Sequence, residues 1–142
     1  MQQNCVLMLE DSRERLERFT RVLTEIAPEW VLRHWRAAPA MIRECGPYLP
    51  CCGLICLDHD LNPLSGSTED PGDGLEVARH LATLRPACPI LIHSSNGEGA
   101  TRMLGEFQLG GWEAYTILPL GEGWIERYWR GRVVELLSRR ME

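Results

Sequence analysis

The chain alternates short apolar runs with helix-type patterns five times, and this alternation limits the folds open to its 142 residues. Residues 5–9 are apolar at every position, which is typical of a strand buried on both faces of a parallel sheet. Five strands are expected, over residues 5–9, 30–35, 53–57, 89–93 and 114–118. No repeat or linker interrupts the pattern, so it predicts a single α/β domain over residues 1–142.

Helix-type patterns lie between the strands, and capping residues mark several of their ends. Ser12 is an expected N-cap, and Pro28 ends the first helix. The second helix starts near Pro39 and stops at Gly46-Pro47. The expected helices cover residues 13–27, 39–45, 75–84, 100–109 and 123–140. Residues 61–73 are rich in Gly, Pro and Ser and are expected to form a loop.

Polar side chains follow three of the expected strands at the point where each strand ends. The first strand leads into Glu10-Asp11-Ser12, the third into Asp58-His59-Asp60 and the fourth into His93-Ser94-Ser95-Asn96. Ligands of open parallel sheets bind beyond the carboxyl ends of the strands, near the point where the strand order reverses. If these three strands are neighbours, their polar residues form one candidate site.

Four carboxylates belong to this candidate site. Carboxylates a few ångströms apart repel each other, so they need protons or a bound cation. Oxygen ligands with open positions favour Mg²⁺ or a similar divalent cation. We therefore expect a magnesium-type site formed by Asp11 and Asp58, with Glu10 and Asp60 as further ligands or as orienting groups. The alternative is that Glu10 and Asp60 are solvated loop acids.

The same edge carries candidates for proton transfer and for phosphate binding. His59 and His93 are candidate general acids or bases, because imidazole titrates near neutral pH. With Asp58 they make up the candidate catalytic set. Ser94-Ser95-Asn96 precedes a helix, and its hydroxyl, amide and backbone N–H groups suit a phosphate. The same three residues also suit an N-cap and a turn, so both interpretations stand.

All 15 basic residues of the chain are arginines, which excludes chemistry that needs a lysine. A Schiff base and a P-loop both require an ammonium group. The formal net charge of −5 argues against a dedicated nucleic-acid surface, because binding to the phosphate backbone relies on clustered cations. No apolar stretch of about 18 residues and no basic leader occur, so we expect no membrane contact and a cytoplasmic location.

The six cysteines are expected to be reduced thiols in a cytoplasmic protein. A zinc site is the alternative for the four that lie close together in the sequence, Cys45, Cys51, Cys52 and Cys56. The spacing lacks the paired CxxC knuckles of structural zinc sites, which favours free thiols.

The strand-end residues resemble those of the receiver domains of two-component response regulators, over nearly the whole chain. The shared features are the acidic pair Glu10-Asp11, Asp58 after the third strand, Ser94 after the fourth and Pro119 after the fifth. The resemblance implies a flavodoxin-like, doubly wound five-stranded parallel sheet with strand order 2-1-3-4-5. It also implies that Asp58 is at the phosphoacceptor position and Ser94 at the switch hydroxyl position.

Two features depart from the usual receiver pattern. The lysine that this family has just before the proline is Leu118 here, so the cation that holds an acyl phosphate is missing. An arginine such as Arg102 is a candidate to replace it. The second departure is the length of the 61–73 loop, because standard receivers have only a few residues at this position.

Two short stretches resemble a divergent group more closely, the cyclic-phosphate processing receiver family. They are Leu57-Asp58-His59-Asp60-Leu61 and His93-Ser94-Ser95-Asn96, in the expected order and at the expected strand ends. The resemblance implies phosphoesterase activity on cyclic phosphates.

Two other motif interpretations are weaker. Asp58-His59-Asp60 also resembles the DxD motif of haloacid-dehalogenase-type phosphatases, but that family needs a lysine. Asp58, Asp60, Asn62 and Glu69 fit EF-hand loop positions, but Pro63 replaces the required glycine.

The leading hypothesis is a metal-dependent phosphoester hydrolase whose substrate is a phosphate-containing small molecule or a nucleotide end. Mg²⁺ would polarise the phosphoryl oxygens, and the 61–73 loop would act as a lid. The competing hypothesis is an atypical receiver, phosphorylated on Asp58, that a protein partner binds through residues 112–124. A receiver fold that keeps its acids only as a structural metal site is the third.

Overall fold

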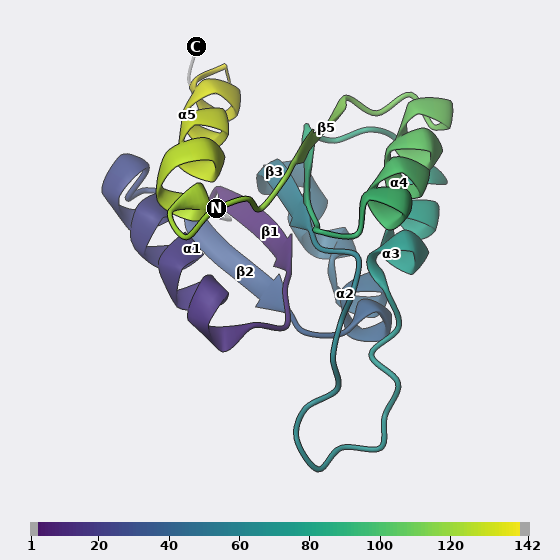
Figure 1. Ribbon diagram of the computed structural model, residues 1–142. Coiled ribbons are helices and arrows are strands. Elements are labelled where there is room, and N and C mark those ends of the chain that lie inside the picture. The colour runs from purple at the N-terminus through teal and green to yellow at the C-terminus, as the bar shows by residue number, and fades with distance from the viewer. Residues whose placement is uncertain (1–2, 140–142) are drawn as a thin grey trace.

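The computed structural model describes residues 3–139 and contains one five-stranded parallel sheet (Figure 1). The strand order is β2-β1-β3-β4-β5, as expected for the receiver-like, doubly wound fold. All four strand pairings are parallel. The strands are β1 (Cys5–Leu9), β2 (Val31–Trp35), β3 (Cys52–Leu57), β4 (Ile90–His93) and β5 (Ala114–Ile117).

Helices cover both faces of the sheet, as the alternation of patterns predicts. They are α1 (Arg13–Ile26), α2 (Ala38–Glu44), α3 (Gly74–Ala82), α4 (Gly97–Leu109) and α5 (Arg130–Ser138). Helices α1 and α5 lie on one face, and α2, α3 and α4 lie on the other (Figure 1). Right-handed crossovers between parallel strands produce this two-sided covering.

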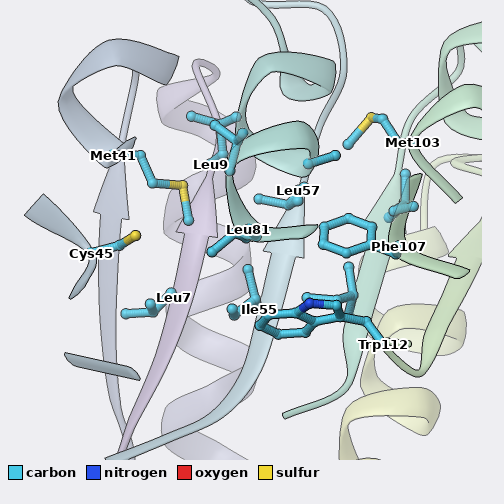
Figure 2. Close-up of a cluster of buried hydrophobic side chains, with 14 of the residues drawn as sticks. Leu7, Leu9, Met41, Cys45, Ile55, Leu57, Leu81, Met103, Phe107 and Trp112 are labelled. Atoms are coloured by element: carbon cyan, nitrogen blue, oxygen red, sulfur yellow. The ribbon is translucent and has the colours of Figure 1, made fainter. Parts of the chain in front are cut away.

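Each face of the sheet has its own apolar core. On the side of α2, α3 and α4, strand residues such as Leu7 and Ile55 pack against Met41, Leu81 and Phe107 (Figure 2). On the side of α1 and α5, alternate strand residues pack against Phe19, Ile125 and Trp129. Burial on both faces explains why β1 and β3 are apolar throughout.

The first three helices begin and end within two residues of the sequence prediction, whereas α4 and the segment after α2 differ more. Helix α4 begins at Gly97, not at residue 100, because Asn96 caps it by accepting a hydrogen bond from the Gly99 N–H. A 3₁₀-helix, Gly46–Cys51, follows α2 where only a stop was expected. Its first turn is closed by an i→i+3 hydrogen bond, which Tyr48 N donates to Cys45 O.

The long final helix predicted over residues 123–140 is not uniform. Ile125–Trp129 is π-helical and α5 follows it, whereas Arg140 lies outside the described residues. Trp124 and Trp129 both contact the Phe19 ring, with centroids 5.7 and 4.7 Å away. Residues five apart diverge by about 140° on an α-helix, and the wider π-helical turn brings them to one side.

The segment between β3 and α3 forms the loop expected over residues 61–73, and it projects from the carboxyl edge of the sheet (Figure 1). Its ends are held close together by a bridge between Asp60 and Asp73. Gly66 and Gly72 adopt positive φ values of 83° and 68°, which other residues rarely adopt. The loop therefore begins and ends beside the candidate site.

Candidate functional site

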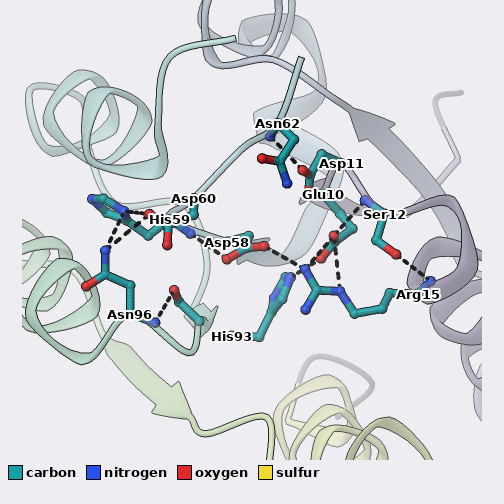
Figure 3. A network of polar contacts seen from close by, with 11 residues as sticks. Glu10, Asp11, Ser12, Arg15, Asp58, His59, Asp60, Asn62, His93 and Asn96 are labelled. Atoms are coloured by element: carbon teal, nitrogen blue, oxygen red, sulfur yellow. Dashed lines mark hydrogen bonds and ion pairs between the residues drawn. The ribbon is translucent and has the colours of Figure 1, made fainter. Parts of the chain in front are cut away.

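Glu10 lies at the carboxyl end of β1 and is 1% exposed. Its Oε1 is 2.9 Å from His93 Nε2, and its Oε2 accepts hydrogen bonds from Ser12 N at 2.9 Å and Arg15 Nη2 at 2.8 Å (Figure 3). Burial alone would raise the pKa of Glu10, but the bond and charge of His93, the charge of Arg15 and the Ser12 N–H lower it to about 2. Glu10 is therefore a buried carboxylate.

Asp58 lies at the end of β3, next to β1, and is 5% exposed. Its Oδ2 accepts from Arg15 Nη2 at 2.8 Å, and its Oδ1 accepts from the His59 N–H at 2.8 Å. Burial and the charge of Glu10 raise the pKa of Asp58, and His93 and Arg15 oppose that rise. A carboxylate has about four lone-pair positions, so Asp58 retains capacity for a further partner.

Arg15 joins these two carboxylates, and the sequence analysis did not identify it. Ser12 caps α1 by accepting from the Arg15 N–H at 3.2 Å, which places Arg15 in the first helical turn. Side chains of a helix point toward its amino terminus, and here that direction leads over Glu10 and Asp58. The sequence does contain a feature that could have identified Arg15: it lies three residues after the N-cap Ser12, which directly follows the acidic residues at the end of the first strand. Arg102, the expected replacement for the missing lysine, is exposed, and its side chain makes no hydrogen bond or ion pair within the described residues.

His59 lies at the mouth of the site and is paired with a neighbouring acid. Its Nδ1 is 2.7 Å from Asp60 Oδ1, and Asn96 Nδ2 donates to the same oxygen at 3.1 Å (Figure 3). These two hydrogen bonds lower the pKa of Asp60. An ionised carboxylate only accepts, so the contact suits a ring with its proton on Nδ1. The ring packs against Gly99, where a Cβ atom would lie 2.6 Å from two ring carbons.

His93 is at the end of β4 and is fully buried. Its ring centroid lies 5.0 Å from that of Phe19 and 6.1 Å from that of Trp124. Nε2 contacts Glu10, and Nδ1 is a buried atom without a hydrogen-bond partner in the described part of the chain. This environment gives His93 the position of an orienting group behind Glu10.

The four acids of the expected metal site lie in two kinds of environment. Glu10 and Asp58 are buried together, whereas Asp11 is partly exposed and accepts from the Asn62 N–H at 2.6 Å. Asp60 is exposed and contacts His59, as described above. Within residues 3–139, the group that could hold a metal consists of Glu10, Asp58 and His93, with one ligand atom of each within 4.8 Å of the others.

The chemistry of these donors fits a divalent cation at Asp58 better than at Glu10. Both oxygens of Glu10 have partners, so a metal there would break the bond to His93 or Arg15. Asp58 has lone pairs to spare, and Asp11 has an oxygen that no described hydrogen bond uses. Two carboxylates with room for water are the usual setting of Mg²⁺. The Arg15 guanidinium supplies a fixed positive charge beside Glu10 and Asp58.

The expected phosphate-binding residues lie at the start of α4. Asn96 Oδ1 caps the helix, and Ser94 Oγ accepts from the Asn96 N–H at 3.1 Å. The N-cap interpretation is therefore confirmed. Ser94 is buried beside the site, whereas Ser95 is exposed. The Ser94 hydroxyl proton and the first N–H groups of α4 remain available to an anion.

The alternative zinc site is not formed in the described part of the chain, where the group of potential ligands is the one around Glu10. Cys52 belongs to the core on the α3 side of the sheet, and Cys56 belongs to the core on the α1 side. None of the six cysteines forms a disulfide within residues 3–139. The EF-hand interpretation also fails, since Asp58 faces Arg15 and Asp60 faces His59.

The strand order, the buried acid after β1 and the aspartate after β3 together define a receiver-type domain. Residues 5–108 match the family of the cyclic-phosphate processing receiver domain, and the chain belongs to this family. The match includes all the site residues described above. No curated protein sequence matches the chain.

Solved structures of response-regulator domains share the fold. The phosphorylated cyanobacterial phytochrome response regulator RcpA has a TM-score of 0.70 and 18% identity, covering 97% of this chain and 96% of its own. The response regulator domain of Thermotoga maritima CheB has a TM-score of 0.66 and 13% identity, with coverages of 97% and 96%. The CheX–CheY–BeF₃–Mg²⁺ complex from Borrelia burgdorferi has a TM-score of 0.62 and 12% identity, with coverages of 98% and 90%.

No helix within residues 3–139 combines the length and the apolar character that crossing a bilayer needs.

Proposed function

We propose that this receiver-type domain is a metal-dependent phosphoester hydrolase that acts on cyclic phosphates. The observation that carries the proposal is the arrangement around Asp58, where Arg15 lies on one side and the His59–Asp60 pair on the other. A phosphate seated between them would meet a fixed cation and a proton acceptor. Membership of the cyclic-phosphate processing family supports the same class of substrate.

Arg15 would bind the phosphate. Its Nε and Nη2 atoms donate to Glu10 and Asp58, and no hydrogen bond of the described residues uses Nη1. The side chain is 26% exposed, so Nη1 is accessible to a non-bridging oxygen. The Ser94 hydroxyl and the amino terminus of α4 would hold a second oxygen. Ser95 would also contact the phosphate on this side, as would the Asn96 amide, which already has protein partners.

His59 would transfer the proton. Its Nε2 accepts a proton from water as the water oxygen forms the new bond to phosphorus. The P–O bond that closes the ring breaks, and the departing oxygen takes a proton from solvent water, while His59 later releases its proton to solvent. Asp60 holds the imidazole with Nδ1 protonated, which keeps the lone pair on Nε2. His93 is fully buried, so its contribution would be to orient Glu10, which in turn holds Arg15.

A divalent cation would be held by Asp58 and Asp11, with Glu10 and Asp60 nearby. The Borrelia burgdorferi complex, a structural neighbour, contains Mg²⁺ together with beryllofluoride, which supports a divalent cation at this edge of the fold. When bound, the cation polarises phosphoryl oxygens and acidifies water. The Asp11 contact to Asn62 ties the start of the 61–73 loop to the site, so the loop would act as a lid.

A second candidate function is that of an atypical receiver phosphorylated on Asp58. The position of Asp58 after β3 and the phosphorylated state of the neighbour RcpA favour it. However, Asp58 Oδ2 is already bonded to Arg15, and Leu118 is exposed at the position where lysine is usual. Of the expected partner surface, Trp112 and Trp124 are buried in the core, and Leu118 and Leu120 are exposed.

The two functions are separated by one experiment on the purified chain. The protein is incubated with Mg²⁺ or Mn²⁺ and a panel of 2′,3′-cyclic nucleotides, and phosphomonoester formation is followed by ³¹P NMR. We expect turnover that is lost in Asp58→Ala and kept in Glu29→Ala, an exposed acid at the opposite edge of the sheet. No turnover above the Asp58→Ala background would refute the hydrolase. Stable labelling of Asp58 by acetyl phosphate would support the receiver function.

A further inference from the structure

The amino-terminal edge of the sheet, opposite the candidate site, carries three neighbouring cysteines. Cys5 begins β1, Cys52 begins β3, and Cys88 lies just before β4. The Sγ atoms of Cys88 and Cys52 are 3.6 Å apart, and a hydrogen bond joins the thiols of Cys52 and Cys5. Nothing in the proposed hydrolase uses these thiols.

A β-bulge at Gly53 places Cys52 in this group. Cys5 pairs with Cys52, but Val6 pairs with Leu54, so Gly53 is an extra residue in β3. Side chains alternate along a strand, and without the extra residue Cys52 would point to the opposite face. Trp30 occupies the space beside the bulge, where a Cβ at position 53 would lie 2.4 Å from two ring carbons. The local fold thus requires glycine, and the result is the Cys52–Cys88 contact.

One of the three cysteines, Cys88, lines a cavity in the described part of the chain. Cys88 faces an open cavity of about 360 Å³, which Gly111, Glu113, Leu136 and Arg139 also line. Cys88 is 7% exposed, whereas Cys52 is 1% exposed and Cys5 is fully buried. A small molecule that enters the cavity therefore reaches Cys88 before Cys52 or Cys5. Arg139 and Glu113 form an ion pair at 2.6 Å, so neither adds an uncompensated charge.

We propose that Cys88 is an oxidation site for small hydroperoxides and that Cys52 converts the oxidised sulfur into an intramolecular disulfide. In the first step the Cys88 thiol releases its proton and the sulfur attacks the peroxide; the O–O bond breaks, the departing hydroxide takes that proton, and a sulfenic acid and one water form. In the second step Cys52 sulfur attacks Cys88 sulfur, the S–O bond breaks, and the departing hydroxide takes the Cys52 proton as water. Two thiols are oxidised to one disulfide, and hydrogen peroxide is reduced to two waters.

The geometry and the chemistry of the group favour this order of steps. The hydrogen bond with Cys52, together with burial, raises the pKa of Cys5. The hydrogen bond with Cys5 lowers the pKa of Cys52, but the hydrogen bond with Cys88 and burial outweigh it and raise that pKa. Both thiols therefore remain protonated and do not react first. A disulfide needs an S–S distance of about 2.05 Å, which side-chain rotation can reach from van der Waals contact. Cys56 lies on the other face of the sheet and cannot compete.

The test treats the full chain with hydrogen peroxide and maps cross-links by mass spectrometry after cleavage at arginine. We expect a loss of two hydrogens and a cross-link whose fragment ions connect Cys52 to Cys88. The cross-link should disappear in Cys52→Ala and in Cys88→Ser, and it should persist in Cys51→Ser, the matched control next to Cys52. In Cys52→Ala the Cys88 sulfenic acid should accumulate and react with dimedone.

Two outcomes overturn the proposal. One is a cross-link that survives in Cys52→Ala, since another thiol would then be the partner. The other is oxidation confined to the partly exposed Cys51, with Cys88 unmodified. Fragment mapping of the unsubstituted chain needs no variant, so it decides the matter even if a substituted chain does not fold. The oxidation is also independent of phosphoesterase activity, so the two proposals can fail separately.

Discussion

Arg15 Nη2 lies 2.8 Å from Glu10 Oε2 and 2.8 Å from Asp58 Oδ2, so one nitrogen joins the acid after β1 to the acid after β3. The contact crosses 43 residues of sequence between Arg15 and Asp58. It gives a lysine-free chain a cation at the point where its carboxylates converge. The protein therefore carries a permanent positive charge beside the position at which a metal would be held.

Replacing this cation should affect both stability and activity. Arg15→Met leaves two buried carboxylates uncompensated, and we expect a loss of about 2 kcal/mol of unfolding free energy because Arg15 is partly exposed. Hydrolysis of a 2′,3′-cyclic nucleotide should fall by about 10²-fold. Urea denaturation and steady-state kinetics measure the two effects. Arg13→Met is the matched control, since Arg13 is 89% exposed and should change stability by less than about 0.5 kcal/mol.

His59 should be the group that moves the proton. His59→Gln keeps the size of the side chain but removes the titrating nitrogen, and we expect kcat to fall by about 10²–10⁴-fold with little change in thermal stability. His80→Gln, on α3 and away from the site, should leave kcat unchanged. The measurement is kcat at saturating substrate together with a melting curve. An unchanged kcat in His59→Gln would assign proton transfer to another group.

The sheet and the position of the site could be predicted from the sequence because both depend on local patterns. Continuous apolar runs identify buried parallel strands, and polar residues at their ends must then meet at one edge, as Asp58 and Glu10 do. The strand order itself was given by the resemblance to receivers. Local capping rules also identified Ser12 and its helix.

The contacts within the site could not be predicted, because they depend on side-chain directions across long sequence separations. Nothing in the spacing shows that Arg15, and not Arg102, reaches Asp58. The sequence placed His93 at the site, but its burial between Phe19 and Trp124 follows from packing between two helices. The π-helical turn over Ile125–Trp129 could not be predicted for the same reason, because it depends on the packing of Trp124 and Trp129 against Phe19.

Glu10 should make stability depend on pH in the acid range. Its pKa is about 2 in the folded chain against an ordinary value of 4.5, so folding is favoured by about 3 kcal/mol when the group is ionised. Because the folded pKa is the lower one, this stabilisation is present above about pH 4.5 and is lost as the pH falls toward 2. Urea denaturation from pH 2 to 7 measures it.

The matched comparison for this pH effect is Glu10→Gln, which cannot ionise. The variant should be less stable than the natural chain at pH 7 by about 3 kcal/mol, and the difference should narrow as the pH approaches 2. Parallel curves for the two proteins over that range would show that Glu10 titrates normally.

The bulge at Gly53 should tolerate no side chain. Gly53→Ala places a Cβ 2.4 Å from two carbons of Trp30 and 3.2 Å from Leu137, and we expect a loss of about 1–3 kcal/mol of unfolding free energy. Gly131→Ala is the control, because a Cβ there meets nothing within 4 Å on α5. That substitution should stabilise the chain by up to about 1 kcal/mol through helix propensity. Equal effects of the two variants would mean that β3 can shift away from Trp30.

Two glycines in the first turn of α4 offer the sharpest test of where the His59 ring must lie. A Cβ at Gly99 would lie 2.6 Å from two carbons of the ring and 2.8 Å from Nε2, whereas a Cβ at Gly97 meets nothing within 4 Å. Both substitutions add the same methyl group and favour the helix. Gly99→Ala should therefore displace the imidazole, and a shift of about 1 Å in a reacting group costs up to about 10²-fold in rate.

We expect Gly99→Ala to lower kcat for cyclic-nucleotide hydrolysis by about 10–10²-fold and Gly97→Ala to leave it unchanged, with both chains melting as cooperatively as the natural one. The His59 imidazole signals in an NMR spectrum should shift in the first variant and stay in place in the second. Full activity in Gly99→Ala despite shifted signals would mean that the ring position does not matter to the reaction. Proton transfer would then have to be assigned to a group other than the His59 imidazole.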